Sequence, residues 1–306
     1  MDRICYSPSL DPFENLALEE TLLAQAEEGT CLFLWRNRPT VVLGRNQNPY
    51  LECRPQQLEA DGVCLVRRLS GGGAVYHDLG NLNYTFLCPE TDFDPDAQTH
   101  LLCRALNGLG LECTFSGRND LLCGGKKCSG QAYYTENGHS LHHGTLLVSV
   151  DLAAMERALT PSPLKLESKS IPSLRQRVVN LSHVCPGLTV GTVARAVLRQ
   201  FQAEHAQLEV EKLSTADLSP ACLARYRSPE WNLGSCPAYE AALDLSTPGG
   251  VLRVSARVQQ GLITAAALSA DTLLPLDLAA AQRALEGIPF TPSAVEARLY
   301  PFFNHN

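Results

Sequence analysis

One turn of the chain concentrates residue types that bind anions. Two arginines, a serine and three consecutive glycines lie between two apolar runs, in the stretch Arg67 to Asp78. Three glycines let the backbone take positive φ and bring its N–H groups close to a ligand, which builds a concave anion site. The guanidinium groups of Arg67 and Arg68 suit phosphate or carboxylate. Taken alone, the segment is equally compatible with a glycine-rich hairpin turn carrying two solvated arginines.

Two further polar segments follow along the chain. Ser116 to Asp120 precedes the loop Gly124 to Tyr133, where Lys126 and Lys127 lie side by side in a chain that has only five lysines. Adjacent lysines at the mouth of a hairpin can also be simply solvated. The third segment, His142 to Val148, places two histidines before an apolar run typical of a strand. Positioned cations beside glycine-rich backbone favour a site for phosphate chemistry.

In this order the segments resemble the lipoate–protein ligase family. Its members carry R-R-x-S-G-G-G-A-V-x-H-D-x-G-N, then S-G-R-N-D, K-x-S-G-x-A and H-H-G-T-L-L, all of which this chain matches. The resemblance extends to residues 11–20, 33–37, 44–49, 175–181 and, more weakly, 230–234. It therefore covers most of the chain.

The resemblance implies an ATP-dependent lipoate–protein ligase. In such an enzyme, lipoate and Mg-ATP give lipoyl-adenylate and pyrophosphate. A lysine on a lipoyl domain then takes the acyl group as an amide, the acceptor being an E2 subunit of a 2-oxoacid dehydrogenase complex or the H protein of glycine cleavage. The implied cofactors are ATP and Mg²⁺, and the family favours a monomer.

The resemblance also assigns roles within the motifs. Lys127 aligns with the lysine of K-x-S-G and is the expected catalytic residue, bridging the lipoyl carbonyl oxygen and the α-phosphate, with Lys126 the weaker candidate. Arg68 would hold nucleotide phosphate, whereas strand alternation directs Arg67 to the opposite face. The residues assigned to ATP and lipoyl-adenylate are Arg68, Ser70, Gly71, Gly72, Gly73, Ala74, Val75, Tyr76, Asn119, Asp120, Lys127, Ser129, Gly130, Ala132, His143 and Thr145.

The remaining assignments concern the metal and the acyl chain. Asp120, next to Asn119, is the expected Mg²⁺ ligand, because Mg²⁺ prefers oxygen ligands and is usually coordinated in part by substrate phosphates. The same pair could instead form an Asx turn before a strand. An apolar acyl chain needs an apolar tunnel, and some of the residues assigned to it could equally be ordinary core. The lipoate pocket is assigned to Leu16, Leu18, Trp35 and His77.

Two residues depart from the family pattern and leave other functions open. Tyr134 stands where many members have an arginine, so one phosphate contact could be missing, which would suit a non-catalytic acyl-binding protein. Cys128 stands beside Lys127, where an aliphatic residue is usual. A cysteine thioester there would suit an octanoyl or lipoyl amidotransferase that needs no ATP.

Composition narrows the class of protein. A formal charge of −7 and a pI near 5.6 argue against general nucleic-acid binding. The 12 cysteines are scattered, without a C-x-x-C pair, as expected of buried thiols in a reducing compartment. No apolar run approaches the roughly 18 residues of a membrane span, and the N-terminus does not resemble a signal or transit peptide. A cytoplasmic protein that binds neither membranes nor nucleic acid is expected.

The order of apolar patterns predicts an α+β fold, a mixed β-sheet covered by helices, with a small C-terminal α+β domain. Helices are expected from Pro12 to about Glu28 and over 100–109, 152–159, 189–205, 276–285 and 293–300. Strands are expected over 31–36, 40–45, 63–69, 82–88 and 146–150, with a hairpin of 251–258 and 262–267. Loss of periodicity between about 211 and 236 indicates a linker. The expected domains are a catalytic domain, 1–235, and an accessory domain, 236–306.

Overall fold

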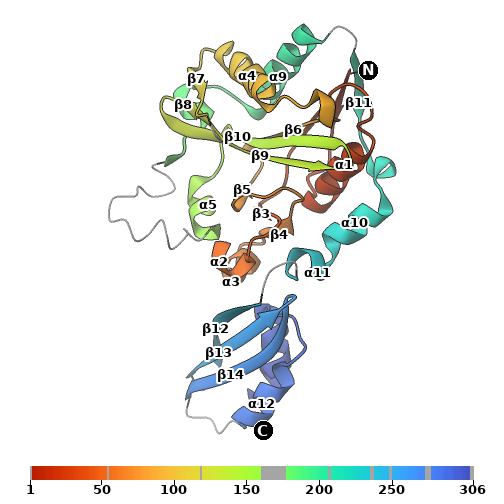
Figure 1. The fold of residues 1–306 in the computed structure, drawn as a ribbon. Coiled ribbons are helices and arrows are strands. Elements are labelled where there is room, and N and C mark those ends of the chain that lie inside the picture. Colours follow the sequence, from red (N-terminus) through yellow and green to blue (C-terminus); the bar gives the residue numbers. More distant parts are fainter. Residues whose placement is uncertain are drawn as a thin grey trace.

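The computed structural model describes residues 2–53, 55–117, 119–159, 177–205, 208–234, 238–247, 250–272 and 277–303. Most of these residues pack around one eight-stranded sheet and a smaller three-stranded sheet, and the C-terminal residues form a third sheet (Figure 1). The predicted class, a mixed sheet covered by helices with a smaller C-terminal α+β unit, is confirmed.

The large sheet mixes parallel and antiparallel pairs, in the order β11-β1-β2-β6-β10-β9-β8-β7. The first three strands run parallel, and each later pair is antiparallel. The strands are β1 (Asp2–Tyr6), β2 (Cys31–Trp35), β6 (Asn81–Pro89), β7 (Cys113–Phe115), β8 (Asp120–Cys123), β9 (Lys126–Glu136), β10 (His139–Leu147) and β11 (Leu208–Lys212).

Helices cover both faces of this sheet (Figure 1). On one face α4 (Pro95–Asn107) packs against α9 (Val190–Glu204), and their apolar residues join the first core. On the other face α1 (Pro12–Ala24) packs against α10 (Pro220–Arg227) in the second core. Shorter helices are α2 (Pro49–Glu52), α3 (Pro55–Ala60), α5 (Leu152–Ala158), α8 (Leu181–Val184), α11 (Pro229–Asn232), η1 (Glu90–Asp92) and η2 (Thr215–Asp217).

Strand alternation decides which side chains reach which core. On β6, Leu82, Tyr84 and Phe86 pack in the first core, beneath α4 and α9. The alternate residues Asn83 and Thr85 are equally buried but face the side of α1. Because successive side chains of a strand point to opposite faces, this strand supplies apolar packing on one side and buried polar groups on the other.

The glycine-rich turn belongs to the small sheet, which has the order β4-β3-β5. Its strands are β3 (Thr40–Leu43), β4 (Cys64–Arg67) and β5 (Val75–His77). The turn joins β4 to β5, and β3 lies between these two strands, parallel to β4 and antiparallel to β5. The segment is therefore a crossover loop, and the alternative of a simple hairpin turn is wrong.

The C-terminal residues build their own sheet and core. Strands β12 (Tyr239–Thr247), β13 (Gly250–Gln259) and β14 (Leu262–Thr272) are antiparallel, with helices α12 (Leu278–Leu285) and α13 (Pro292–Phe303). The predicted hairpin is confirmed, since β13 and β14 meet at Gln260 and Gly261, whose φ values are 52° and 75°. Positive φ at both positions suits a tight turn between twisted strands.

Four expectations about elements need correction. The strand expected over 146–150 is wrong beyond Leu147, where β10 ends, because Val148 N and Ser149 N both donate to Gly80 O. Helix α1 ends at Ala24 rather than near Glu28, because Gln25 turns back to cap it. Helix α4 begins at Pro95, five residues earlier than predicted, because Asp94 is its N-cap. The linker predicted over 211–236 is wrong for its described part: residues 208–234 form β11, α10 and α11, and the buried Tyr226 joins the second core.

Within the described residues, no helix is both long enough and apolar enough to cross a bilayer.

Candidate active site

A cavity of about 750 Å³ opens between the large sheet, the glycine-rich loop and strand β5. Of the residues assigned from the sequence, all but Leu18, Ser70, Gly71 and Ser129 line it. The other lining residues were not assigned, although Lys126 was the weaker candidate beside Lys127. They are Val42, Asn83, Leu122, Gly125, Lys126, Gln131, Gly144, Leu147, Met155, Leu159, Arg177 and Val178.

The four exceptions have local explanations. Leu18 is buried in the second core. Ser129 lies 3.5 Å from the Tyr84 hydroxyl, on the opposite face of the sheet from the cavity. Ser70 is buried beneath the glycine-rich loop, and Gly71 is exposed on it. Ser70 and Gly71 both accept from Arg68, so these two residues support the loop rather than form the cavity wall.

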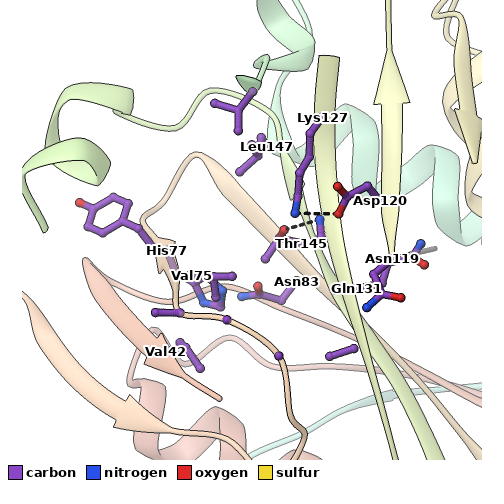
Figure 2. A pocket seen from close by; sticks show the side chains of 18 of the residues that line it. Val42, Val75, His77, Asn83, Asn119, Asp120, Lys127, Gln131, Thr145 and Leu147 are labelled. Carbon is purple, nitrogen blue, oxygen red and sulfur yellow. Dashed lines mark hydrogen bonds and ion pairs between the residues drawn. The ribbon is translucent and has the colours of Figure 1, made fainter. Parts of the chain in front are cut away.

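Lys127 is the second residue of strand β9 and points into the cavity, where its Nζ lies 2.7 Å from Asp120 Oδ1 (Figure 2). Both side chains are about two-fifths exposed, at 39% and 37%. An exposed pair of this kind contributes little to stability, so Lys127 stays available to a stronger anion. Gly130 makes room for the lysine, because a Cβ there would lie 3.1 Å from its Cε and Nζ.

Arg68 lines the cavity, but most of its N–H groups hold the loop. Its guanidinium donates to the carbonyl oxygens of Gly71 at 2.6 Å, Gly73 at 2.8 Å and Val42 at 3.1 Å, and Nε donates to Ser70 Oγ at 3.0 Å. Burial lowers the pKa of Arg68 to about 10, so the group stays charged at neutral pH. Arg68 therefore fixes the shape of the loop as well as its potential.

Arg67 takes a different set of partners, as strand alternation predicts. It is fully buried and donates to the carbonyl oxygens of Gly44, Arg45 and Gln47, which follow β3. It also donates to the carbonyl oxygens of Trp231 and Asn232 at 3.0 Å and 2.9 Å. This arginine ties helix α11 to the strand that leads into the glycine-rich loop.

A buried hydrogen-bonded chain runs from the loop to helix α1. Ser70 Oγ lies 2.6 Å from His143 Nε2, and His143 Nδ1 lies 2.9 Å from Glu19 Oε1. Thr85 donates to the same Glu19 oxygen at 2.6 Å. The sequence reasoning assigned His143 and Ser70 but missed Glu19, whose only signal was its place in the matched segment 11–20.

This chain of hydrogen bonds predicts that Glu19 affects catalysis, although Glu19 itself does not line the cavity. Glu19→Ala is expected to lower kcat/KM for the adenylate formation that the sequence resemblance implies about 10²-fold, because a misplaced loop costs about that much. Glu19→Gln keeps an oxygen acceptor for His143 and should keep most activity. Steady-state kinetics of both variants, beside thermal unfolding, test this. Full activity in folded Glu19→Ala would contradict it.

The two adjacent histidines serve opposite faces of β10. His143 lines the cavity, whereas His142 packs against Tyr84, Phe86 and Tyr133 and lies 2.9 Å from Gln98 Oε1 through Nδ1. Within the described ranges no group of three or more His, Cys, Asp or Glu side chains could hold a metal ion. Because His142 and His143 face opposite sides of the sheet, the two rings are not placed to share one metal ion.

Buried neutral histidine makes stability depend on pH. Burial lowers the pKa of His142 to about 3, well below the value near 6.5 of an unfolded chain. The unfolded state therefore binds the extra proton, and stability falls as pH falls below about 6.5. Between pH 7 and 5 we expect His142 to account for a loss of about 2 kcal/mol. Urea unfolding at both pH values should show a smaller loss in His142→Phe than in wild type, and identical losses would contradict this.

Cys128 is placed where a thioester cannot form. Its side chain is fully buried in the first core and lies 3.4 Å from the carbonyl oxygen of Leu121. It is absent from the cavity lining described above, on the opposite face of β9 from Ala132. The neighbouring departure, Tyr134, packs at the edge of the second core, beside Arg45.

Comparisons with known proteins agree with this geometry. A family model described as lipoyl protein ligase A/B catalytic domain matches residues 11–202, and a bacterial lipoate protein ligase C-terminus matches residues 236–305. Among solved structures, Plasmodium falciparum LipL1 in complex with lipoate is 25% identical, with a TM-score of 0.69, over 100% of this chain and 95% of that one.

Two more structures share the fold over 76% of this chain. A bi-partite lipoate protein ligase from Thermoplasma acidophilum, described with its E2 lipoyl domain, is 25% identical over 96% of its own length, with a TM-score of 0.65. A lipoate-protein ligase A bound with ATP is 24% identical over 98% of its own length, also with a TM-score of 0.65.

Proposed function

Because the chain belongs to the lipoyl protein ligase A/B family, we propose that it is an ATP-dependent lipoate–protein ligase. The observation that carries the proposal is one cavity that joins Lys127 and the glycine-rich loop to an apolar wall. The lipoate bound to the similar LipL1 supports this acid as the substrate. The E2 lipoyl domain described with the Thermoplasma ligase supports lipoyl domains, of E2 subunits or of H protein, as acceptors.

In the first step a lipoate carboxylate oxygen attacks the α-phosphorus of ATP, and the bond to the pyrophosphate oxygen breaks. Two anions must approach while charge moves onto the leaving group. Lys127, which lines the cavity near the start of β9 together with the glycine-rich loop, would lie between carboxylate and α-phosphate. Fixed cations and N–H donors supply what such a step requires, which is positioning and electrostatic stabilisation.

In the second step the neutral amine of an acceptor lysine attacks the acyl carbon, AMP leaves, and an amide forms. Negative charge develops on the acyl oxygen, within reach of the same Lys127 ammonium. The proton lost by the amine passes to solvent or to the departing phosphate. One cation thus stabilises charge in both steps.

The residues present fit a Mg²⁺ ion bound together with ATP. Asp120 and Asn119 line the cavity with one carboxylate and one amide oxygen, and Mg²⁺ is commonly held by one or two carboxylates plus substrate phosphates. Asp120 would hold the ion, and when bound the ion would neutralise phosphate charge. The pair with Lys127 would then open, which frees the lysine for the carboxylate.

The alternative amidotransferase is not favoured. It needs a nucleophilic sulfur at the acyl carbon, and Cys128, its candidate, is buried in the first core away from the cavity. A thiolate requires an electropositive and partly exposed environment. Tyr134 alone is not evidence that catalysis has been lost, because Lys127 and the glycine-rich loop line the cavity without an arginine at position 134.

Mass spectrometry of the products tests the assignment. Purified protein incubated with ATP, Mg²⁺ and lipoate should form lipoyl-AMP and pyrophosphate, and adding a lipoyl domain should give a product heavier by one lipoyl group. Transfer from a lipoylated or octanoylated carrier without ATP would identify an amidotransferase instead. Binding of lipoate with neither product would identify a non-catalytic protein.

We also propose a catalytic domain of residues 1–235 and an accessory domain of 236–306. The C-terminal sheet has its own apolar core, and every residue that lines the described cavity precedes Val179. A chain that ends at Ser235 is expected to lose lipoyl-AMP formation but still transfer the group from supplied lipoyl-AMP. Equal loss of both activities in a folded protein would contradict this division.

We expect the enzyme to act as a cytoplasmic monomer. Eleven cysteines of the described chain are free thiols, which suits a reducing compartment. Sedimentation analysis at micromolar concentration should give a single species near 33.3 kDa, and a stable dimer would contradict the monomer.

A further inference from the structure

Two residues that line the cavity each carry a buried nitrogen atom without a hydrogen-bond partner among the described residues. These atoms are His77 Nε2 and Asn83 Nδ2, and no described residue accepts from either. The two side chains are 3% and 1% exposed. A buried N–H left unpaired costs free energy, so such a group in a binding pocket indicates an acceptor on the ligand.

The hydrogen bonds around His77 determine which nitrogen carries the proton. Asn15 Nδ2 faces the carbonyl oxygens of Ser9 and Arg36 at 3.0 Å and 2.8 Å, which fixes its amide orientation. It also donates to Asn37 Oδ1 at 3.0 Å, so the nitrogen of Asn37 must be the atom 3.2 Å from His77 Nδ1. Because Nδ1 accepts, the ring hydrogen is on Nε2.

The same ring stays neutral. Burial, with the charges of Arg68 and His143, lowers the pKa of His77 to about 3. At neutral pH His77 therefore presents a single N–H donor rather than a positive charge. Asn83 also presents an N–H donor. Its Oδ1 accepts from Asn81 Nδ2 at 2.8 Å, and its Nδ2 has no partner among the described residues.

The position of these donors matches the far end of an acyl chain. Asn83 lies opposite Thr145 on the neighbouring strand, and Thr145 accepts from Gly130 on the strand of Lys127. Two strand spacings, about 10 Å, therefore separate Asn83 from the strand of Lys127. This is comparable to the length of extended lipoate from its carboxylate to its dithiolane ring. Figure 2 shows Val42, Val75 and His77 on the side of the pocket away from Lys127 and Asp120.

The rest of this end is apolar. Leu16, Val42 and Val75 line it, and the Trp35 ring lies 6.0 Å from the His77 ring, edge to face. An apolar pocket alone discriminates weakly between acids of similar length and width. Two N–H donors in such a wall would be poorly matched to a hydrocarbon terminus.

We propose that His77 and Asn83 donate to the sulfur atoms of the dithiolane ring and so select lipoate over octanoate. Sulfur is a weak acceptor, yet octanoate offers hydrogen atoms alone at this position and would leave both donors desolvated. A site with polar groups placed for the ligand rejects an analogue that lacks the acceptor. The inference rests on the proposed ligase function, and names the feature of the acid that the site recognises.

Kinetics with the two acids as alternative substrates test the proposal. Wild type should use lipoate with a kcat/KM about 10-fold or more above that for octanoate, the cost of leaving a buried donor unpaired. His77→Leu should lower the ratio several-fold, with Asn83 left as the remaining donor, while His77→Gln, which keeps an amide N–H, should lower it less. Val42→Ala is the matched control, because it changes the wall without removing a donor and should lower both acids in parallel.

The outcomes separate the two proposals. If wild type forms neither lipoyl-AMP nor octanoyl-AMP, the ligase assignment fails. If wild type forms both with equal efficiency, or if His77→Leu leaves the ratio unchanged, the ligase assignment stands and the selection by sulfur is overturned. Should His77→Leu fail to fold, Asn83→Leu decides in the same way, since an unchanged ratio in that variant also overturns it.

Discussion

Lys127→Ala is expected to abolish lipoyl-AMP formation, with a loss of about 10²- to 10³-fold or more, typical of removing one positioned donor. Within the described cavity its Nζ is the ammonium beside Asp120 and over Gly130, where the carboxylate and α-phosphate would meet. Lys126 is the matched control, because it precedes Lys127 and also lines the cavity. Lys126→Ala should keep most of the activity.

Cys128→Ala completes the comparison, because the competing mechanism puts its chemistry on this sulfur. A small buried thiol exchanged for alanine should cost roughly 1 kcal/mol of stability and leave activity in place. The measurement is ATP-dependent lipoylation of an acceptor domain by each variant. An inactive but folded Cys128→Ala beside an active Lys127→Ala would overturn the ligase mechanism.

Local patterns predicted much of the fold. Asp11 caps α1 through Phe13 and Glu14, as its Asp-Pro start suggests. Alternation along β6 and the turn at Gln260 and Gly261 were also readable, because their causes lie within a few residues. Such elements are decided by local hydrogen bonds and by the period of apolar residues.

The segment 208–234 was misread because its partners are remote. Strand β11 is mostly exposed, and its alternation of apolar and charged residues is only five residues long. It pairs with β1, some two hundred residues earlier, so its place in the sheet depends on a remote partner. The side chain of Asn232 accepts from Arg67 N at 2.8 Å, and Trp231 Nε1 donates to Arg67 O at 2.8 Å. Tertiary contacts of this kind override weak local preference.

The residues of the candidate site also fall into two groups, those that local sequence predicts and those that only tertiary contacts determine. The motifs indicated the loop, Lys127 and His143, because glycine and adjacent cations have local meaning. Glu19 and Asn83 were missed, since a buried acid on a helix and an amide on a strand acquire roles only when distant strands bring them to His143 and the cavity. Strand alternation separates Asn83 from Leu82 and Tyr84, but it does not indicate which ligand the face of Asn83 meets.

The second large effect separates the two arginines that precede the glycine-rich loop. Arg67→Ala is expected to destabilise the fold by roughly 4 kcal/mol or more, as breaking a fully buried hydrogen-bond network does. Five carbonyl groups, from the segment after β3 and from α11, would lose their donor, and the bonds to those of Gly44 and Asn232 are fully buried. Urea unfolding at neutral pH measures the loss.

Arg68→Ala should act mainly on activity. Two of its acceptors, Gly71 and Gly73, lie on the exposed loop, where water can replace the lost N–H groups. The loop would relax and lose its positive charge, and charge-assisted hydrogen bonds are worth about 1.5–3 kcal/mol each, so pyrophosphate release should fall at least 10-fold. Arg67→Lys and Arg68→Lys serve as controls that keep the positive charge but not the planar guanidinium and its several N–H donors.

The comparison is decided by activity per folded molecule. Folded Arg67→Ala, where enough remains, should release pyrophosphate at a rate closer to wild type than Arg68→Ala does, because Arg67 is absent from the cavity wall. If both variants lose the same activity per folded molecule, the division between a fold-supporting and a ligand-facing arginine is incorrect. If Arg67→Ala unfolds at the same urea concentration as wild type, its buried contacts do not hold helix α11.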